Sequence, residues 1–586
     1  MGAPEGRSMS QHRSIRAIHA WRFLAPWVLV LVCALLYSNS LHGEFVYDDE
    51  AAILRNPSIR SAWPPFSALR PPRMMTSSGR PLVNYSIAVN HALGSFNVFG
   101  YHVFNVAVHA AATLLFYLTL RRTLSAVRSF AGHATTLAFA VALIFAVHPL
   151  QTAAVSYVIQ RAESMCAIFV LATLYASCRA LQTSSPWMWQ VLAVLACMLG
   201  MLCKEVMAVV PLLVLLYQWV FSSMSFRDLI RTQWALYLGL SLSWIVLFLV
   251  AYGARRESAG FGFESMTPWG YVKIQCDVLW QYFGKCFWPK PLYFDIGWVS
   301  PPALSAVAWK AALLLFSFVL SVLLALRRSA AGFAGLWVFL LLAPSSSIVP
   351  VASEMYAEQR MYLPLAGIVS LVVVGVASLV SRPIHCLGRK TSIAAFGLGC
   401  VLIALAAASL ALQTWNRNRV YETRVSLWTN VVESRPDNPR GHYNLGVAVE
   451  EDGRLEEAMR HYSKAVSLFP RYAKAHNQLG ILFGKSGDYD RALHHLETAS
   501  SVDPSLFEAW NNLGNLYFSR KEPLQAARHY ETSLALDPGQ PATHFNLGLC
   551  LENLQRLEEA RVHFAEALRL DPGFEPARRK LSRSGS

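Results

Sequence analysis

The chain has 586 residues, of which 54% are hydrophobic and 15% are charged, and its formal net charge is +15. So apolar a composition indicates a lipid bilayer as the main solvent and argues against a string of ordinary soluble domains. The part of the chain before Gln413 contains 29 Lys/Arg and 14 Asp/Glu, whereas the part after it contains 22 of each. The whole positive excess therefore lies before Gln413. That confinement is typical of membrane topology, and no basic patch is interleaved with aromatic residues, so we expect no nucleic-acid partner.

Residues 1–22 are polar and carry four arginines, which predicts a cytoplasmic N-terminal segment ahead of an uncleaved first span. From 23 to 413 apolar runs recur, and we interpret this part as a transmembrane domain of about eleven spans. The candidate spans are 23–40, 101–120, 134–148, 163–181, 187–203, 205–221, 233–252, 307–326, 331–349, 361–381 and 392–412.

The charges between the runs predict which face each connection occupies. With the N-terminus inside, every second connection is cytoplasmic and carries basic residues, as the positive-inside rule requires. These residues are Arg121, Arg122, Arg128, Arg179, Arg227, Arg231, Arg327, Arg328, Arg382, Arg389 and Lys390. The same topology places 12 of the 14 acidic residues that precede Gln413 on the non-cytoplasmic face, together with the tail after the last span. One miscounted helix would reverse the side of the tail.

Two of the outer loops, 41–100 and 253–306, are long, and the first begins with an acidic cluster. Asp48, Asp49 and Glu50 follow one another close to the end of the first span. Carboxylates near hydrocarbon lose solvation and repel each other, so a plain connection would use neutral residues. We therefore interpret Asp48 and Asp49 as functional. Helices are expected near 81–93 in the first loop and, along the membrane interface, from Trp269 to Trp288 in the second.

Other outer loops also place acids and bases at span ends. They contribute His148, Arg161 and Glu163, then Lys204 and Glu205, then Glu354, Glu358, Arg360 and Tyr362. Each residue alone could cap a helix or place its charge at the interface. Their recurrence on one predicted face favours a shared polar pocket. The ten cysteines have no metal-ligand spacing, and most lie inside apolar runs, so they predict neither a zinc site nor a disulfide framework.

The tail after Gln413 has a different pattern, with prolines at 436, 470, 504, 538 and 572, a spacing of 34. Leu-Gly pairs and single alanines return in the same register, which is the signature of tetratricopeptide repeats with two helices each. We assign four repeats to 439–586 and a half-repeat connector to 414–438. His442, His476, Trp510 and His544 share one repeat position, where a packing role is favoured over ligand binding.

The motifs together resemble the transmembrane and tetratricopeptide-repeat O-mannosyltransferases and their bacterial relatives. They are Phe45-x-Tyr47-Asp48-Asp49, His148-Pro149 to Arg161-Ala162-Glu163, Lys204-Glu205, and Glu358-x-Arg360-x-Tyr362-x-Pro364, followed by the repeats. The resemblance implies an all-α, GT-C-type glycosyltransferase with a polyprenyl-phosphate-linked sugar donor and a catalytic acidic pair in the first outer loop. Ala153 departs from the pattern, in which relatives carry an acid there, and this leaves metal binding by that loop open.

The chemistry also follows from the residue types. A Ser or Thr hydroxyl that attacks an anomeric carbon needs a general base, and Asp48 or Asp49 would serve. The departing phosphate develops negative charge, which basic groups can stabilise. As donor-binding and phosphate-binding candidates we name Arg80, His148, Arg161, Glu163, Lys204, Glu205, Glu358, Arg360 and Tyr362. A divalent metal is compatible with this chemistry but not required by it, and we assign no cofactor or metal ligand.

We therefore expect an inverting, multi-pass membrane glycosyltransferase that moves a hexose, mannose by preference, to protein hydroxyls on the non-cytoplasmic face. The repeats would hold the acceptor through Asn444, Asn477, Asn511, Asn512 and Asn546. The host would be a bacterial inner membrane, or the endoplasmic reticulum in a eukaryote, with the repeats periplasmic or lumenal. One alternative is a non-enzymatic membrane scaffold that assembles partners. A second, a flippase, is disfavoured because the runs hold almost no ionisable residues in mid-span.

Overall fold

A computed structural model describes residues 5–583 except 73–74, 254–266, 298, 347–354 and 385–388. The predicted candidate Glu354 lies outside these described residues. The described chain is α-helical and contains no strand, which confirms the predicted fold class. Its contacts divide it into two compact units. The first comprises 1–295 and 299–427, and the second comprises 296–298 and 428–586.

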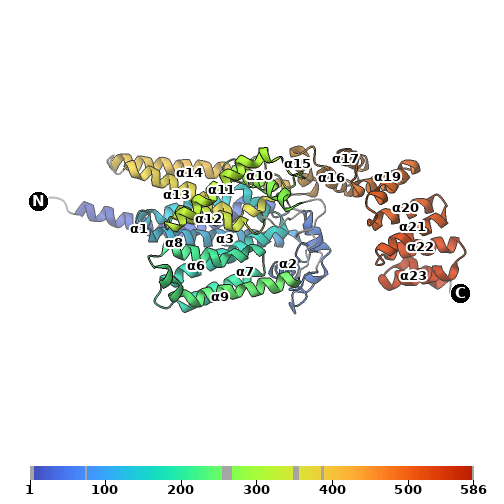
Figure 1. Ribbon diagram of the computed structural model, residues 1–586, viewed down its shortest axis with the longest axis horizontal. Helices are drawn as coiled ribbons and strands as arrows, with labels where there is room; N and C mark the ends of the chain where they lie inside the picture. Colours follow the sequence, from blue (N-terminus) through green and yellow to red (C-terminus); the bar gives the residue numbers. More distant parts are fainter. Residues whose placement is uncertain are drawn as a thin grey trace. The chain divides into compact units, whose positions relative to one another are not determined.

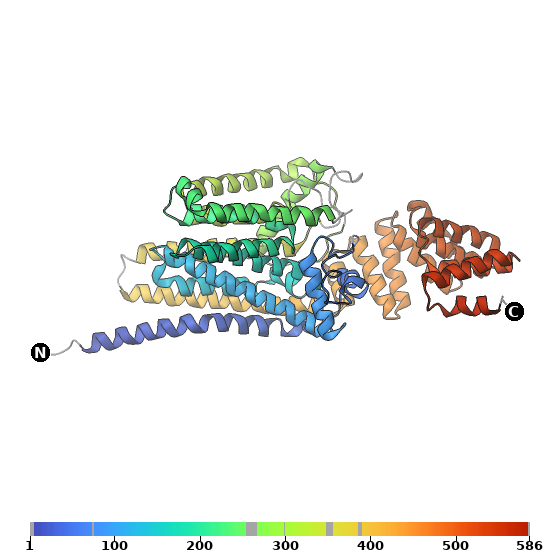
Figure 2. The same ribbon diagram turned by 90° about the horizontal axis from the view of Figure 1, so that it is seen from below.

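The first unit, called the membrane unit below, is a bundle of long helices that lie side by side (Figures 1 and 2). Their bounds are α1 Glu5–Leu36, α3 Val98–Ala126, α4 Ala134–Val147, α6 Arg161–Leu181, α7 Trp187–Met201, α8 Val210–Phe221, α9 Phe226–Gly253, α11 Leu304–Leu326, α12 Ala330–Leu342, α13 Pro364–Ile384 and α14 Arg389–Asn418. Three further helices, α2 Pro81–Gly94, α5 Thr152–Val155 and α10 Pro268–Phe287, lie in the connections. The helices expected near 81–93 and at Trp269–Trp288 are therefore present.

Each of the eleven predicted apolar runs coincides with a helix of this unit. In the described residues, six helices are long and apolar enough to cross a membrane, or seven if the bent pair Ala131–Val147 and Pro149–Val155 counts as one span. Four further apolar helices are shorter, among them α12, which ends at Leu342 although the run was expected to reach 349. The total of eleven spans stays a prediction.

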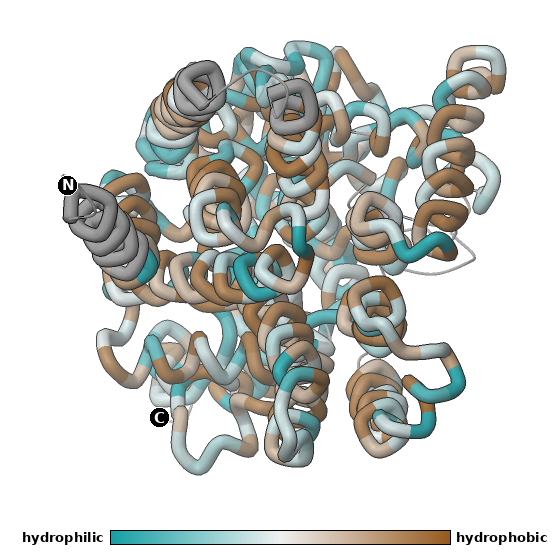
Figure 3. Tube along the Cα trace, turned by 90° about the vertical axis from the view of Figure 1, so that its left-hand side faces the viewer, coloured by the Kyte–Doolittle hydropathy of each residue, from teal (hydrophilic) through white to brown (hydrophobic). Residues whose placement is uncertain are grey.

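The exposed surface of this unit is strongly apolar. On α11, Leu315 and Phe316 are each 63% exposed, and α9 exposes Phe248 and Leu249 to a similar extent. Figure 3, which looks along the helices, shows hydrophobic residues on the outside of many of them. Exposed apolar surface on this scale marks contact with a partner or with lipid, and the length of the helices favours lipid.

The break between α4 and α5 has a local cause. Proline lacks an N–H and forces the residue before it into an extended conformation. His148 accordingly has φ −75° and ψ 133°, and the two helical pieces meet at 57°. The bend turns the chain back across the end of the bundle, where the outer loops gather.

The second unit, the repeat unit, is a series of helix pairs, which confirms the predicted repeats. The connecting helix is α15 Arg424–Ser434, and the pairs are α16 Pro439–Glu451 with α17 Leu455–Leu468, α18 Ala473–Lys485 with α19 Tyr489–Val502, α20 Phe507–Ser519 with α21 Pro523–Leu536, and α22 Pro541–Asn553 with α23 Leu557–Leu570, followed by α24 Glu575–Arg583. Glycine lets the helices of a pair approach closely: a Cβ on Gly514 would lie 2.6 Å from the Tyr530 ring.

A ring-on-ring contact recurs at the repeat position that begins with His442. In the first, second and fourth repeats it is a histidine pair, with Nδ1 to Nδ1 distances of 3.2 Å for His442–His461, 2.9 Å for His476–His495 and 3.0 Å for His544–His563. The first histidine of each pair also bonds a proline carbonyl through Nε2, which makes Nε2 the donor and Nδ1 the acceptor. In the third repeat Trp510 stacks on His529.

These histidine pairs make the stability of the repeat unit depend on pH. Burial lowers the pKa of His495 to about 4, with the charges of His476 and His494 adding to the effect, and burial also lowers the pKa of His461. The folded state therefore binds fewer protons than the unfolded state. Stability should be complete above an unfolded pKa of about 6.5 and should fall as pH drops from there toward 4.

We predict that lowering the pH from 7.5 to 5 lowers the hydrogen-exchange protection factors of α18 and α19 in the full-length protein by about fivefold or more, after correction for the intrinsic pH dependence of amide exchange and for partial solvent screening. His476→Trp, which copies the stacked arrangement of Trp510 on His529, should reduce that loss of protection. Exchange that is equally pH-dependent in the wild type and in this variant would show that the pair does not carry the effect.

Candidate functional site

The outer-loop residues gather at one end of the membrane unit because remote segments are bonded to one another there. The backbone N–H of Glu44 donates to Glu422 O at 2.9 Å, and that of Leu82 donates to Leu202 O at 3.1 Å. The His148 Nε2 donates to Cys286 O at 3.2 Å. These bonds join the first outer loop, the loops after α4 and α7, and the end of α14 into one polar layer.

Asp49 is fully buried and holds two of these loops together. Its Oδ2 accepts the backbone N–H of Val46 at 3.1 Å, and its Oδ1 accepts that of Ile159 at 2.7 Å. Burial raises the pKa of the Asp49 carboxyl to about 7, against the opposing effect of the two backbone bonds, and the neighbouring Asp48 raises it further. Both oxygens are thus occupied inside the protein, which suits a positioning role better than contact with a substrate.

Asp48 differs from its neighbour because it is only half-buried. Its backbone N–H donates to the Tyr157 hydroxyl at 2.9 Å. Burial holds the pKa of Tyr157 well above its ordinary value, so the hydroxyl keeps its proton. The preceding Tyr47 has φ 49°, a left-handed conformation that costs a non-glycine residue about 1 kcal/mol or more. The protein therefore holds this turn in a strained conformation, with Asp48 at its accessible edge.

Aromatic rings border Asp48 on the protein side. Phe294 lies with its centroid 5.8 Å from Tyr47 and 5.5 Å from Tyr157, and Tyr421 stacks on Tyr157 at 6.5 Å. Tyr47 remains 40% exposed. A partly exposed ring beside a carboxylate can cover the apolar face of a ligand while the carboxylate takes its polar edge.

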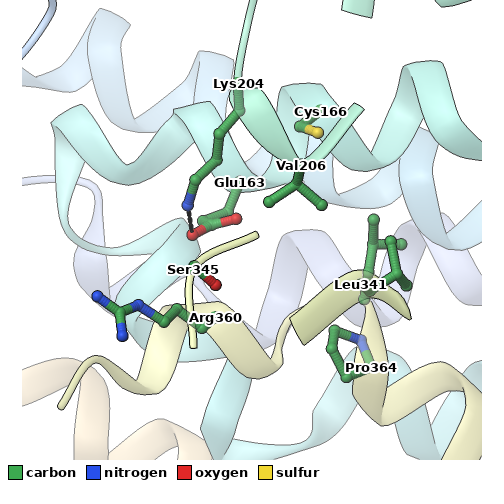
Figure 4. Close-up of a pocket in the computed structure, with 9 residues that line it drawn as sticks. Glu163, Cys166, Lys204, Val206, Leu341, Ser345, Arg360 and Pro364 are labelled. Carbon is green, nitrogen blue, oxygen red and sulfur yellow. Dashed lines mark hydrogen bonds and ion pairs between the residues drawn. The ribbon is translucent and has the colours of Figure 1, made fainter. Parts of the chain in front are cut away.

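A second polar site is a small pocket in the same layer (Figure 4). Its polar lining residues are Glu163, Lys204, Ser345 and Arg360, and its apolar ones are Cys166, Val206, Leu341, Leu363 and Pro364. Figure 4 shows the Lys204 ammonium directed at the Glu163 carboxylate, with which it forms a buried ion pair. Because Glu163 balances Lys204, the charge that Arg360 adds makes the lining positive by one unit.

Glu358 fixes the segment that presents Arg360. It lies in the 3-10 turn Glu358–Met361, is 2% exposed, and accepts the Tyr293 N–H and the Tyr356 hydroxyl. An Arg417 guanidinium lies 3.7 Å from its second oxygen. Burial raises the pKa of Glu358 against the opposing charge of Arg417. Glu358 therefore anchors the turn from inside.

Three predicted donor-binding residues are instead engaged within the protein. Arg161 is fully buried and donates to Asn90 Oδ1, Tyr101 O, Val158 O and, weakly, Ser86 Oγ at 2.6, 3.1, 3.3 and 3.5 Å. The His148 Nδ1 accepts the Leu150 N–H at 3.2 Å. The buried Tyr362 hydroxyl bonds His109 Nδ1 at 2.6 Å. These contacts favour packing roles, and the predicted contact with donor phosphate receives no support.

The remaining two candidates border the polar layer. Arg80 precedes α2, beside the bond that joins Leu82 to the Lys204 segment, and within the described residues its buried Nε has no hydrogen-bond partner. Glu205 is half-buried and begins the turn that leads into α8. The described residues contain no group of three His, Cys, Asp or Glu side chains arranged as metal ligands. A divalent metal stays a prediction.

Sequence reasoning missed several residues of this site. Tyr157, Phe294 and Arg417 contact predicted residues but stand in no motif that pointed to them. In the sequence, Tyr157 is an ordinary aromatic residue four positions before Arg161. Only the fold places its hydroxyl beside Asp48. In the repeat unit Asn512 donates to Asn477 and Asn511 accepts the Thr543 hydroxyl, and Asn515, which was not predicted, links Asn512 and Asn546.

Comparison with known proteins identifies relatives of both units. Residues 77–252 match the family model described as dolichyl-phosphate-mannose-protein mannosyltransferase. Residues 451–487, 477–541 and 541–574 match tetratricopeptide-repeat models. The chain is therefore related to mannosyltransferases of this type in its membrane unit and carries tetratricopeptide repeats after it.

Curated relatives match this chain over about three quarters of its length. A protein O-mannosyl-transferase of Caenorhabditis elegans is 26% identical over 76% of the chain and 63% of its own length. Protein O-mannosyl-transferase TMTC1 of Homo sapiens is 27% identical over 77% of the chain and 55% of its own length. Protein O-mannosyl-transferase TMTC4 of Mus musculus is 26% identical over 75% of the chain and 66% of its own length. The chain thus spans less than two thirds of these relatives.

Among solved structures, the protein MamA is 24% identical over 25% of the chain and 86% of its own length, with a TM-score of 0.24. YrrB, described as a TPR protein with an unusual peptide-binding site, is 24% identical over 26% of the chain and 79% of its own length, also with a TM-score of 0.24.

Substitutions of the two neighbouring aspartates should have different effects on the stability of the protein. Asp49→Asn replaces a carboxylate that accepts two backbone N–H groups by an amide with a single acceptor oxygen, so one buried N–H loses its partner. We expect a loss of about 1–3 kcal/mol in unfolding free energy, read as a lower midpoint in thermal unfolding of the detergent-solubilised protein. Asp48→Asn should stay within about 0.5 kcal/mol of the wild type. Equal effects of the two variants would contradict the assigned roles.

Proposed function

We propose that this chain, as a relative of the protein O-mannosyl-transferases that carry tetratricopeptide repeats, is a multi-pass membrane glycosyltransferase of the inverting type. It transfers a hexose, mannose by preference, from a polyprenyl-phosphate-linked donor to Ser or Thr hydroxyls of proteins on the non-cytoplasmic face. The host membrane is a bacterial inner membrane, or the endoplasmic reticulum in a eukaryote.

The observation that carries this proposal is the difference between the paired aspartates. Asp49 is buried and bonded to two backbone N–H groups, whereas Asp48 is half-buried at the edge of a strained turn. A general base must reach the proton that it removes, to within hydrogen-bond distance. We therefore assign the base to Asp48 and a positioning role to Asp49.

The reaction then balances as a single displacement. The Asp48 carboxylate takes the proton of the acceptor hydroxyl, and the oxygen forms a bond to the anomeric carbon of the sugar. The bond from that carbon to the phosphate oxygen breaks, and its electron pair leaves on the lipid phosphate. Attack from the face opposite the leaving group inverts the anomeric centre.

The pocket at Arg360 suits the departing phosphate. Arg360 and Lys204 supply cationic donors, and the ion pair with Glu163 orients Lys204. Val206, Leu341 and Leu363 form an apolar wall that can meet the first part of a lipid chain. A phosphate held at the border of polar loops and apolar helices is the geometry that a lipid-linked donor requires.

The end of α14 supports placing the repeats on the face of Asp48. Asn418 donates to Leu36 O at 3.1 Å and to Asn39 Oδ1 at 2.8 Å, and it accepts the Ser156 hydroxyl at 3.0 Å. The last helix of the membrane unit therefore ends against the start of the first outer loop. The chain continues into the repeats from this position.

Incubation of the purified protein with radiolabelled polyprenyl-phosphate mannose and Ser/Thr peptides should transfer label to peptide. Asp48→Asn should reduce kcat by about 10²-fold or more, because general base catalysis contributes that much, and it should leave the unfolding midpoint unchanged. Arg360→Gln should reduce kcat as well, because the leaving phosphate loses a charge-assisted donor.

Arg70→Gln, at an exposed arginine of the same loop, serves as the matched control and should retain activity. A folded Asp48→Asn variant with wild-type transfer would refute the assigned base. Absence of transfer with every donor tried, together with intact partner assembly, would favour the scaffold alternative.

Topology can be tested with single cysteines introduced into a background where all ten native cysteines are replaced by serine or alanine. An impermeant maleimide should label Ser95→Cys, beside α3, and Ser519→Cys, in the third repeat, from the same side of the membrane. Thr183→Cys, between α6 and α7, should react only from the other side. Labelling of Ser95→Cys and Ser519→Cys from opposite sides would separate the repeats from the site and contradict the proposal.

A further inference from the structure

A short segment of the second outer loop contacts both polar sites of the membrane unit. It comprises residues 293–297, which follow α10, and we call it the strap. None of its residues was a predicted site residue, and the proposed mechanism gives none of them a role. Its contacts, taken one residue at a time, connect the turn that presents Arg360 with the turn that presents Asp48.

Tyr293 holds the turn that presents Arg360. Its backbone N–H donates to the buried Glu358 carboxylate, and its ring lies 6.0 Å from the ring of Tyr356. The Tyr356 hydroxyl donates to the same Glu358 oxygen at 3.1 Å, so the strap and the segment before the turn share one acceptor. The Lys285 ammonium lies 5.0 Å from the centroid of the Tyr293 ring, a cation–π contact that joins the strap to α10.

Phe294, the next residue, contacts the turn that presents Asp48. Its ring centroid lies 5.8 Å from that of Tyr47, 5.5 Å from that of Tyr157 and 6.1 Å from that of Tyr421. All three pairs are edge-to-face, an arrangement that is attractive and that fixes the direction of each ring. Tyr47 has the left-handed conformation of the turn, and Tyr157 accepts the Asp48 N–H. The Phe294 ring therefore helps to hold Asp48 in place.

The far end of the strap is fixed by a glycine. By their contacts, Ile296 and Gly297 belong to the repeat unit, whereas the residues up to Asp295 belong to the membrane unit. Gly297 has φ 74°, a conformation that glycine adopts without strain. A Cβ on Gly297 would lie 2.7 Å from Asn438 Oδ1. Asn438 is the N-cap of α16 and is buried, so the strap ends against the start of the first repeat.

We propose that the strap positions the base Asp48 and the phosphate-binding Arg360 relative to each other, with Tyr293 and Phe294 as positioning residues and the first repeat as the fixed end. This inference rests on the proposed function, because it assigns a role in the same reaction. Displacement at the anomeric carbon requires the acceptor oxygen and the leaving phosphate to be aligned, and a misplacement of about 1 Å can cost about 10²-fold in rate. The repeat unit is then required for the geometry of the site, even with a short acceptor peptide.

Phe294→Ala tests the positioning role with polyprenyl-phosphate mannose and a short Ser/Thr peptide. It should lower kcat about tenfold or more while both KM values stay within about twofold. It should also raise the ratio of free mannose, formed when water attacks the anomeric carbon and the lipid phosphate leaves, to mannosylated peptide. Phe294→Tyr keeps the ring and should retain most transfer. Phe283→Ala, which removes an α10 ring that contacts Phe339, is the control and should leave the ratio unchanged. A loss of folded protein lowers both products in proportion, so an unchanged ratio in Phe294→Ala would overturn the positioning role.

The fixed end is tested at Gly297. Gly297→Ala introduces a Cβ against Asn438 and should lower kcat about fivefold or more. Asn438→Gly removes the obstructing side chain and keeps an acceptable N-cap, so the double variant should be more active than Gly297→Ala alone. Gly453→Ala is the matched control, because Gly453 has φ 79° but a Cβ there would meet no atom within 4 Å, and it should retain activity. Additive losses in the double variant would overturn the anchor at the first repeat.

Hydrogen exchange separates this inference from the proposed function, because it requires no sugar donor. In the full-length protein, Gly297→Ala should lower the protection factors of both turns, residues 46–50 and 358–362, by about threefold or more, and Gly453→Ala should change neither. That result together with absent sugar transfer would retain the strap as the connection between the two turns and refute the transferase. Unchanged protection in both turns would overturn the strap, whatever the outcome of the transfer assay.

Discussion

The carboxylate of Asp49 is the constraint on which the organisation of the site depends. Its two oxygens accept backbone N–H groups from Val46 and Ile159, which are more than 100 residues apart in the chain. Such bonds are strong in a buried environment, and their loss leaves an unpaired N–H there. The first outer loop is thus fixed against the segment before α6, and the strained turn at Tyr47 can persist with Asp48 at its edge.

The same logic applies to the rest of the polar layer. An apolar bundle can hold charge at its end only if each charge has a partner, because desolvation of a lone ion costs several kcal/mol. Glu163 pairs with Lys204, Glu358 has Arg417 and two hydrogen bonds, and Arg161 is surrounded by acceptors. Many of the acids and bases in the motifs thereby support the site, while contact with a ligand is what we propose for Asp48 and Arg360.

The repeat unit uses regular spacing for two purposes. Glycines and alanines let paired helices approach, and ring pairs such as His476–His495 fill the contact next to them. On the first helices the amides bond to one another and still keep free donors and acceptors. One 34-residue period therefore sets both the packing of the array and the spacing of the surface that it presents.

The sequence by itself determined the class of the fold, the positions of the apolar runs, the helices of both long loops and the repeats, because hydrophobic and small-residue periodicity is local. It also identified Asp48, Asp49, Lys204 and Arg360 as candidates, because a charged residue beside an apolar run costs desolvation energy and therefore suggests a function. It could not separate residues that support the site from residues that act in it. Only the tertiary structure shows that Asp49 and Arg161 are enclosed, that Tyr157 reaches Asp48, and that Glu163 balances Lys204, because burial and pairing depend on contacts between segments far apart in the chain.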